Sequence, residues 1–294
     1  MKDGIYTDIT IKEYHGNRTH ISSTNLRKAR RSLKEFRFYQ DGKISEEKSC
    51  FDFGNAFELA LIDKKGFENH VAIMQDQVWI NEALEEKPEL KSPRSSKKYQ
   101  ELFKGFTDEN KGKYLINDTG NESFETIEYM LTSCYQDRVI KKLLENIEYQ
   151  TSIFWTDKVT GLRLKTRPDV CKLNKNVVVD VKTADDGSPE AFSKALANYD
   201  YPFQACMQID GVQQSGYMTV DSYFWLVVEK KPPYNATLYQ FSPEDIRYCM
   251  DEYTYVKECI RKAYESNLFP GYTQRSDNKF GVLTAQIPLW YKTI

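Results

Sequence analysis

Two aspartates and a lysine lie close together near the middle of the 294-residue chain. Pro168 and Asp169 are followed, after ten residues, by Asp180, Val181 and Lys182. If this stretch folds as two strands joined by a turn, the two carboxylates and the lysine come to lie side by side. Carboxylates held together repel each other, and a divalent cation with oxygen ligands relieves that repulsion. A lysine beside them can hold or activate a water, so this spacing indicates a site.

Alternation along residues 161–182 predicts the two strands. One face of the first strand is mainly apolar, and it carries Leu162, Leu164, Thr166, Pro168 and Val170. The opposite face is charged, and it carries Arg163, Lys165, Arg167 and Asp169. Residues 173–176 supply a polar turn. The second strand points Val177, Val179 and Val181 one way, and Val178, Asp180 and Lys182 the other.

An ordered set of short motifs surrounds these residues. The set comprises Phe154–Asp157, Thr160–Gly161, Lys165–Asp169, Asp180–Thr183, Tyr201 and Gln204–Ala205. It resembles the PD-(D/E)XK nuclease signature as it occurs in RecE-type (exodeoxyribonuclease VIII-like) phage exonucleases, a group close to the RecB nuclease family and to lambda exonuclease. The resemblance extends from about Tyr14 to the end of the sequence. It implies an α/β (α+β) fold with a restriction-endonuclease-like core, in which helices flank a central mixed sheet.

The length suits one nuclease domain over residues 1–294. We expect a mainly helical N-terminal part over about 20–146, a catalytic core over about 147–266 and a C-terminal tail.

The resemblance also implies roles for individual residues. Asp169 and Asp180 would bind one or two Mg²⁺ (or Mn²⁺) ions, with the Val181 carbonyl as a further ligand. Lys182 would orient the attacking water or neutralise the phosphate. Gln204 would contact the site or a phosphate, with a helix-capping or surface amide as its alternative interpretation.

This sequence departs from the family pattern at two positions. Relatives carry a histidine metal ligand in a Gly-x-Ala-x-His helix, where this chain has Glu58. Glu58 can replace it, because carboxylates bind hard cations well, or it can face solvent. A tyrosine is expected where this chain has Gln208, and its role stays open. Gln150 is the nearest match to a glutamate that precedes a strand in relatives, and no ligand role is assigned to it.

Contacts to a nucleic acid require positive charge in one place, because the formal net charge is −2. Arg163, Lys165 and Arg167 share the Asp169 face and are candidates for holding the DNA backbone. A serine-capped helix with apolar residues from Leu26 to Phe36 carries further basic residues, and Arg27, Arg30 and Arg31 are candidate phosphate contacts. The alternative is an ordinary solvated helix. Residues 87–98, rich in Pro, Ser and Lys, predict a weakly ordered loop, either solvated or at the mouth of a DNA channel.

We therefore expect a metal-dependent deoxyribonuclease. The resemblance implies a 5′-to-3′ exonuclease on double-stranded DNA in phage-type recombination. It further implies a ring-shaped homo-oligomer (trimer or tetramer) that hands a 3′ tail to a single-strand annealing protein. The alternatives are a structure-specific or endonucleolytic PD-(D/E)XK nuclease and a catalytically inactive DNA-binding module.

Composition adds limits on location. The mean hydropathy is −0.64, and the sequence has no apolar run long enough for a membrane span. The N-terminus lacks the apolar core of a signal peptide, so we expect a cytoplasmic protein without a membrane partner. The six cysteines form no CxxC pair, which favours ordinary buried thiols over an iron–sulfur cluster.

Patterns elsewhere predict further elements, with residues 1–23 expected to be irregular. Helices are expected over 122–146, from Ser188, over about 201–211 and over about 243–265; strands are expected over 151–156, 217–220, 223–229 and 236–241. The aromatic tail at 287–291 is expected to dock on the domain or on a neighbouring subunit.

Overall fold

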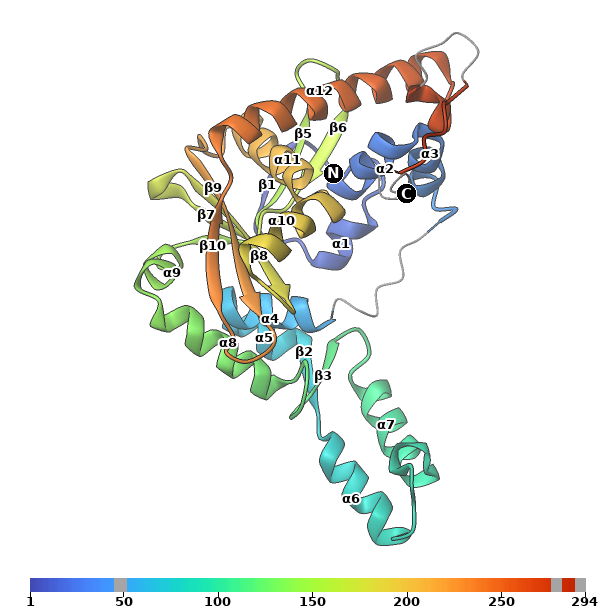
Figure 1. Cartoon of the computed structure of the whole chain (residues 1–294), viewed down its shortest axis with the longest axis vertical. Coiled ribbons are helices and arrows are strands. Elements are labelled where there is room, and N and C mark those ends of the chain that lie inside the picture. Colours follow the sequence, from blue (N-terminus) through green and yellow to red (C-terminus); the bar gives the residue numbers. More distant parts are fainter. Residues whose placement is uncertain (45–51, 276–281, 289–294) are drawn as a thin grey trace, which may run out of the picture.

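The computed structural model describes residues 1–44, 52–275 and 282–288. Helices flank a central mixed sheet, which confirms the predicted α/β fold class (Figure 1). Among the described residues this sheet has the order β10-β9-β8-β7-β4, in which β8 and β9 run parallel and the other neighbours antiparallel. Its strands are β4 (Glu148–Tyr149), β7 (Val170–Lys172), β8 (Val177–Ala184), β9 (Ser222–Glu229) and β10 (Ala236–Gln240).

Two smaller sheets complete the described strands. An antiparallel sheet has the order β1-β5-β6, and a parallel pair joins β2 to β3. Their strands are β1 (Gly4–Tyr6), β5 (Ser152–Thr156), β6 (Arg163–Thr166), β2 (Val71–Met74) and β3 (Tyr114–Asn117).

Two apolar cores lie on opposite faces of β8, as its alternation predicts. Val177, Val179 and Val181 pack with α4, α5, α8 and α9; Val178 packs with α2, α3, α10, α11 and α12. These helices are α2 (Ser23–Arg31), α3 (Leu33–Gln40), α4 (Asp52–Ile62), α5 (Lys64–His70), α8 (Phe124–Gln136), α9 (Arg138–Leu143), α10 (Pro189–Asn198), α11 (Tyr201–Gln214) and α12 (Pro243–Ser266). None of the helices in the described part of the chain is both long and apolar enough to cross a membrane.

Helix α11 lies unusually close to the small sheet. Gly211 makes this possible, because a Cβ at that position would lie 2.7 Å from the Trp155 ring and 2.8 Å from Thr166 Cγ2. Any side chain at Gly211 would push α11 away from β5 and β6.

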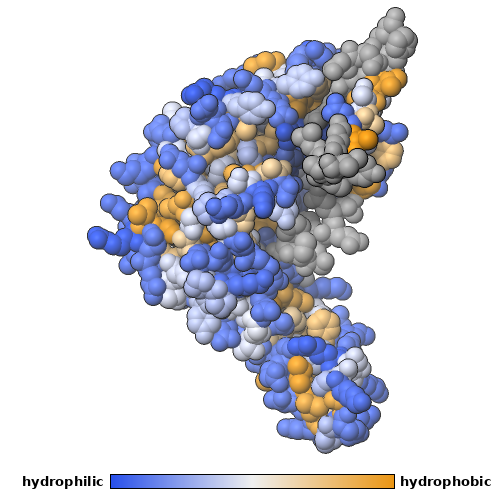
Figure 2. Space-filling model, in the orientation of Figure 1, coloured by the Kyte–Doolittle hydropathy of each residue, from blue (hydrophilic) through white to orange (hydrophobic). Residues whose placement is uncertain are grey.

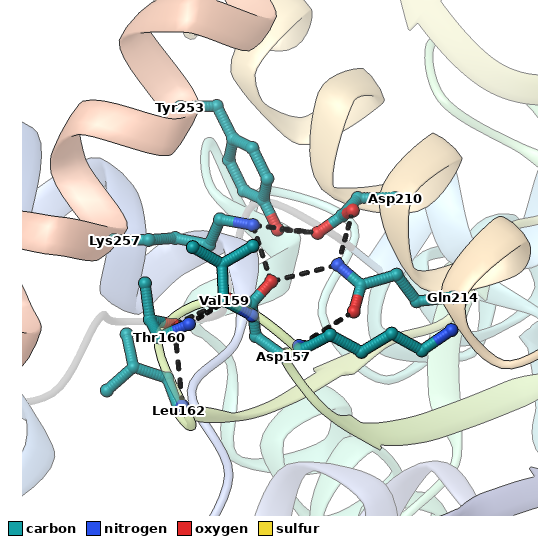
Figure 3. A network of polar contacts seen from close by, with 9 residues as sticks. Asp157, Val159, Thr160, Leu162, Asp210, Gln214, Tyr253 and Lys257 are labelled. Atoms are coloured by element: carbon teal, nitrogen blue, oxygen red, sulfur yellow. Dashed lines mark hydrogen bonds and ion pairs between the residues drawn. The ribbon is translucent and has the colours of Figure 1, made fainter.

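A buried polar network fixes α11 and α12 to the turn that follows β5 (Figure 3). Lys257 Nζ on α12 lies 2.7 Å from Asp157 Oδ2 and 3.1 Å from Asp210 Oδ2. Tyr253 donates to Asp210 at 2.8 Å, and Gln214 donates to Asp157 at 2.9 Å. The hydrogen bonds and the ammonium outweigh the burial of Asp157, so the pKa of that carboxyl is lowered. The network therefore holds α11 in place against α12 and the turn after β5.

An arm projects from the body opposite α12 (Figure 1). It consists of the strands β2 and β3, helix α6 (Asp76–Glu86), the short helix η1 (Pro93–Ser95) and helix α7 (Lys97–Glu109). Trp79, Ala83 and Tyr99 form its own small core, and Figure 2 shows hydrophobic residues among the hydrophilic ones on its surface.

The arm corrects the prediction of a weakly ordered loop at 87–98. Part of that run forms η1, and α7 begins at Lys97. Asp76 organises it, because its carboxylate accepts from Arg94 at 2.6 Å and from Tyr99 at 2.5 Å. Charge-assisted hydrogen bonds of this kind stabilise a short, mainly polar connection.

Several predicted elements are interrupted by side chains that cap helices. The helix expected from Leu26 to Phe36 breaks at Ser32, whose hydroxyl accepts from the Glu35 N–H at 3.2 Å and begins α3. The helix expected over 122–146 breaks in the same way at Asp137, which caps α9. Residues 1–23 are not wholly irregular, because they contain β1 and α1 (Ile11–Gly16).

Two strand predictions are wrong. Residues 217–220 form no strand and instead follow the end of α11, so β9 begins only at Ser222. The strand expected over 161–170 splits into β6 and β7, which belong to different sheets. The expected helices near 188–198, 201–211 and 243–265 and the strands near 151–156, 223–229 and 236–241 are confirmed as α10, α11, α12, β5, β9 and β10. The docking prediction for residues 287–291 extends beyond the described residues. Among the cysteines, Cys134, Cys171 and Cys206 are free and buried.

Candidate active site

The antiparallel pairing of β7 and β8 brings Asp169, Asp180 and Lys182 together. The register pairs Val170 with Val179, so Asp169, one residue before β7, lies opposite Asp180. Its Oδ2 accepts from the Val181 N–H at 2.7 Å. Lys182 Nζ lies 2.5 Å from Asp180 Oδ2. The break between β6 and β7 leaves Asp169 in a loop, yet its carboxylate is tied to β8.

Two glutamines of α11 hold the buried carboxylate of Asp180. Gln204 and Gln208 donate to its Oδ1 at 3.1 Å and 3.3 Å. Tyr223 on β9 donates to Gln208 Oε1 at 2.8 Å, which fixes the orientation of that amide. Asp180, Gln208 and Tyr223 are each no more than 1% exposed. Gln208, whose role the sequence left open, therefore positions Asp180 together with Gln204.

Glu58 reaches the same region from α4. Its Oε1 accepts from Gln150 Nε2 at 3.0 Å, and Gln150 Oε1 accepts from Arg167 at 3.2 Å. Arg167 also donates to the Ser152 hydroxyl at 3.0 Å. Of the two predicted positions for Glu58, solvent or site, the structure places its side chain at the site.

The three carboxylates and the lysine influence one another strongly. Burial raises the pKa of Asp169 well above its usual value, and the charges of Glu58 and Asp180 raise it further. Burial also raises the pKa of Glu58, with a smaller contribution from the Asp180 charge. Burial alone would lower the pKa of Lys182, but the charges of Asp180 and Asp169 outweigh it and raise that pKa. Burial and mutual repulsion make it costly to keep these carboxylates ionised side by side, and a bound cation would relieve that cost.

The donor set is open rather than closed. Among the described residues, no group of three or more His, Cys, Asp or Glu side chains is arranged to hold a metal ion. Mg²⁺ commonly binds through only one or two carboxylates and completes its shell with water and substrate phosphate. Asp169 and Asp180 fit such a partial donor set, with Glu58 as a further carboxylate close enough to affect the pKa of Asp169.

A cleft of about 550 Å³ opens onto these residues. We call it the main cleft. Its wall includes Tyr14, Asn55, Glu58, Gln150, Arg167, Asp169, Gln204 and Gln208, and also Arg27 from α2. The Nε atoms of Arg27 and Arg167 are buried there, and neither has a hydrogen-bond partner in the described part of the chain. The guanidinium groups of Arg27 and Arg167 give the wall of the main cleft positive charge, which favours an anion there.

Two of the basic residues predicted to face DNA donate to backbone carbonyls of the protein itself. Lys165 is 3% exposed, and its ammonium donates to the carbonyls of Tyr14 at 2.5 Å and Asn17 at 2.7 Å. Burial lowers its pKa to about 8. Alternation placed Lys165 on a polar face, but α1 and the loop after it cover that face. Arg163 is exposed and donates to the Met1 carbonyl at 2.8 Å.

The arginines of α2 also differ from one another. Arg30 is held by Glu252 at 2.7 Å and by Asp200, so it joins helices rather than facing the main cleft. Arg31 is exposed. Arg27 lines the main cleft and donates to the Tyr199 carbonyl at 2.8 Å. Arg27, Arg167 and the buried Lys165 are thus the predicted phosphate contacts that the structure places in the wall of the main cleft.

Sequence reasoning assigned no role to three residues of this region. Gln208 follows Gln204 by one helical turn, and that spacing was a usable signal for a shared face. Tyr201 lies beneath Lys182, whose Nζ is 4.9 Å from its ring centre. Gln150 links Glu58 to Arg167 across elements that are distant in sequence, and no local pattern predicts such a contact.

The mixed sheet, the paired aspartates and the neighbouring lysine define a PD-(D/E)XK-type domain. The family model of the PDDEXK-like domain of unknown function (DUF3799) matches residues 22–278, and the chain belongs to this family. This result confirms the PD-(D/E)XK resemblance seen in the sequence, and family and fold together support a nuclease.

A solved structure shows a related fold. The crystal structure of a candidate exonuclease from Eubacterium rectale aligns with a TM-score of 0.58 and 11% identity over 97% of each chain. The crystal structure of SSO0001 aligns with a TM-score of only 0.29 and 13% identity, over 79% of this chain and 93% of that one. No curated protein matches the sequence.

Proposed function

We propose that the protein hydrolyses phosphodiester bonds of DNA with the help of Mg²⁺ or Mn²⁺. One observation carries the proposal: Asp169 and Asp180 lie side by side on the β7–β8 pair, with Lys182 Nζ 2.5 Å from Asp180. Asp169 and Asp180 would hold the ion, with the Val181 carbonyl and Glu58 as further oxygen ligands. When bound, the ion would supply Lewis-acid stabilisation of the phosphate and a more acidic water.

The protein's own residues account for binding and positioning in this proposal. Arg27 and Arg167, whose guanidinium groups lie in the wall of the main cleft, would attract the phosphate backbone. Lys182 would orient the attacking water or neutralise the phosphate at the point of attack. The water oxygen forms a bond to phosphorus, the bond to the leaving oxygen breaks, and that oxygen takes up a proton. Backbone contacts carry no base information, so we expect cleavage without strong sequence preference.

The finer features of the proposal rest on the resemblance to RecE-type exonucleases. We propose 5′-to-3′ degradation of double-stranded DNA in phage-type recombination, in the cytoplasm. The resemblance further supports a ring of three or four copies and transfer of the 3′ tail to a single-strand annealing protein. The Eubacterium rectale structure, described as a candidate exonuclease, supports an exonuclease rather than an endonuclease.

Cleavage of linear duplex DNA by matched variants tests the catalytic assignment. Asp169→Asn should reduce cleavage to background with either ion. Glu148→Gln is the matched control, because Glu148 is an exposed carboxylate on β4, the strand that pairs with β7 in the same sheet. Its activity should equal that of the wild type. Normal cleavage by Asp169→Asn would refute the assignment.

A further inference from the structure

A second cleft of about 500 Å³ borders the catalytic residue Lys182. Lys182, Tyr199, Tyr201 and Lys194 contribute to its wall, whereas Gln204 lines the main cleft. Helix α11 thus presents Tyr201 to one cleft and Gln204, one turn later, to the other. Because Lys182 also pairs with Asp180, the second cleft lies next to the catalytic group.

Stacked aromatic rings line the second cleft. The rings of Tyr199 and Tyr201 are 5.4 Å apart with an interplanar angle of 26°, and Lys182 Nζ is 4.9 Å from the Tyr201 ring centre. Tyr201 is largely covered by these neighbours, but Tyr199 is 58% exposed. An open ring that extends a stack away from a catalytic lysine is well placed to receive another flat ring.

The turn that carries these tyrosines is held firmly. Asp200 between them has a φ of 53°, in the left-handed region that few residues adopt. Arg30 pairs with the Asp200 carboxylate and with Glu252 on α12. Arg27 donates to the Tyr199 carbonyl at 2.8 Å. Two arginines of α2 therefore fix the position of the rings before any ligand binds, which lowers the entropy cost of binding.

One lysine of the second cleft, Lys194, is available to an anion. Asp185 is paired with Lys230 at 3.0 Å and with Lys231 at 2.9 Å. Lys194 is exposed at the rim, where Asp186 also lines the cleft and interacts with its charge, but no carboxylate of the described residues lies within ion-pair distance of Lys194. A phosphate near Lys194 would therefore meet an ammonium that forms no direct ion pair with the described residues.

We propose that the second cleft binds one unpaired nucleotide of the DNA next to the cleavage point, with its base stacked on Tyr199 and its phosphate near Lys194. This inference rests on the proposed nuclease function and adds to it the substrate class: a DNA end whose terminal nucleotides are separated from the complementary strand. Stacking on aromatic rings accepts any base, which agrees with the absence of base-specific contacts.

Binding of a short oligothymidylate, measured by fluorescence anisotropy with Ca²⁺ in place of Mg²⁺, tests this proposal. Tyr199→Ala should weaken binding about 5- to 150-fold, the range expected for one lost base–aromatic stack. Tyr199→Phe keeps the ring and should bind like the wild type. Tyr248→Ala removes a 73% exposed tyrosine of α12 and should also bind like the wild type.

A photocrosslink locates the base directly. An oligothymidylate with one 5-iododeoxyuridine should crosslink to the peptide that contains Tyr199 and Tyr201. Unchanged binding by Tyr199→Ala, or crosslinks only elsewhere, would overturn the second-cleft proposal while leaving the nuclease function intact. Absence of cleavage of any DNA by the wild type would instead overturn the nuclease function, and the binding and crosslinking results would still decide the role of the cleft.

Discussion

Replacing Gln208 with methionine should destabilise the protein through two separate effects. The variant keeps a similar volume but loses the 3.3 Å hydrogen bond to Asp180 and leaves the Tyr223 hydroxyl without its acceptor. A hydrogen bond to a charged group contributes about 1.5–3 kcal/mol, and a buried unpaired donor costs about 1–3 kcal/mol. The free energy of unfolding should therefore fall by about 2.5–6 kcal/mol.

The partner substitution separates these two effects. Tyr223→Phe leaves the Gln208 carbonyl unpaired and should cost about 1–3 kcal/mol. The double variant has neither an unpaired hydroxyl nor an unpaired amide carbonyl. It should lose only the bond to Asp180, about 1.5–3 kcal/mol, which is less than the sum of the single effects.

Urea unfolding of the wild type, both single variants and the double variant measures this coupling, provided that all four show the same dependence on urea concentration. We expect the double variant to be more stable than additivity predicts by at least about 1 kcal/mol. Additive losses, within about 0.5 kcal/mol, would refute the hydrogen-bonded chain from Tyr223 through Gln208 to Asp180.

Three further predictions follow from the site and its supports. Because burial and neighbouring charges raise the pKa of Glu58 and of Asp169, the contribution of these two groups to stability without metal should be complete below about pH 4 and should be lost as the pH rises through their folded-state pKa values. Thermal unfolding at pH 7 should accordingly show a higher Tm for Asp169→Asn than for the wild type, with a smaller increase on adding Mg²⁺; equal metal-induced shifts would contradict the site. Lys257→Met removes the cation from Asp157 and Asp210, which keep only their hydrogen bonds, and should lower the free energy of unfolding by about 3–5 kcal/mol, measured in urea; a loss below about 1 kcal/mol would show that the network contributes little. Arg167→Gln should weaken DNA binding and reduce the slope of log affinity against log salt by about 0.7–0.9, whereas an unchanged slope would remove Arg167 from the phosphate contacts.

Local sequence patterns were sufficient to predict that Asp169 and Asp180 lie together at the centre of the site. Alternation around Asp180 predicted its strand and both of its faces, because side chains of a strand alternate whatever packs against them. The ten residues between Asp169 and Asp180 are enough for a short hairpin, and that hairpin brings the two carboxylates together.

Long-range packing accounts for what the sequence did not predict. Lys165 lies on the charged face that alternation assigned to DNA contacts, but α1 and the residue that follows it, which are distant in sequence, cover the ammonium and supply two carbonyl acceptors. Gln150 and Tyr223 gain their roles only through partners on other elements. The breaks at Ser32 and Asp137 arise because a capping side chain interrupts an apolar pattern that otherwise continues.

Release of a terminal label from linear duplex DNA, by the wild type and by Asp180→Asn, tests the central claim most directly. One substrate carries the label at a 5′ end, a second carries it at a 3′ end, and a closed circle serves as the control. The proposal predicts Mg²⁺- or Mn²⁺-dependent loss of the 5′ label by the wild type, an intact circle, and no release by Asp180→Asn. Cutting of the circle would indicate an endonuclease. Equal cleavage by both proteins, or DNA binding without cleavage in the presence of either ion, would contradict the proposed active site.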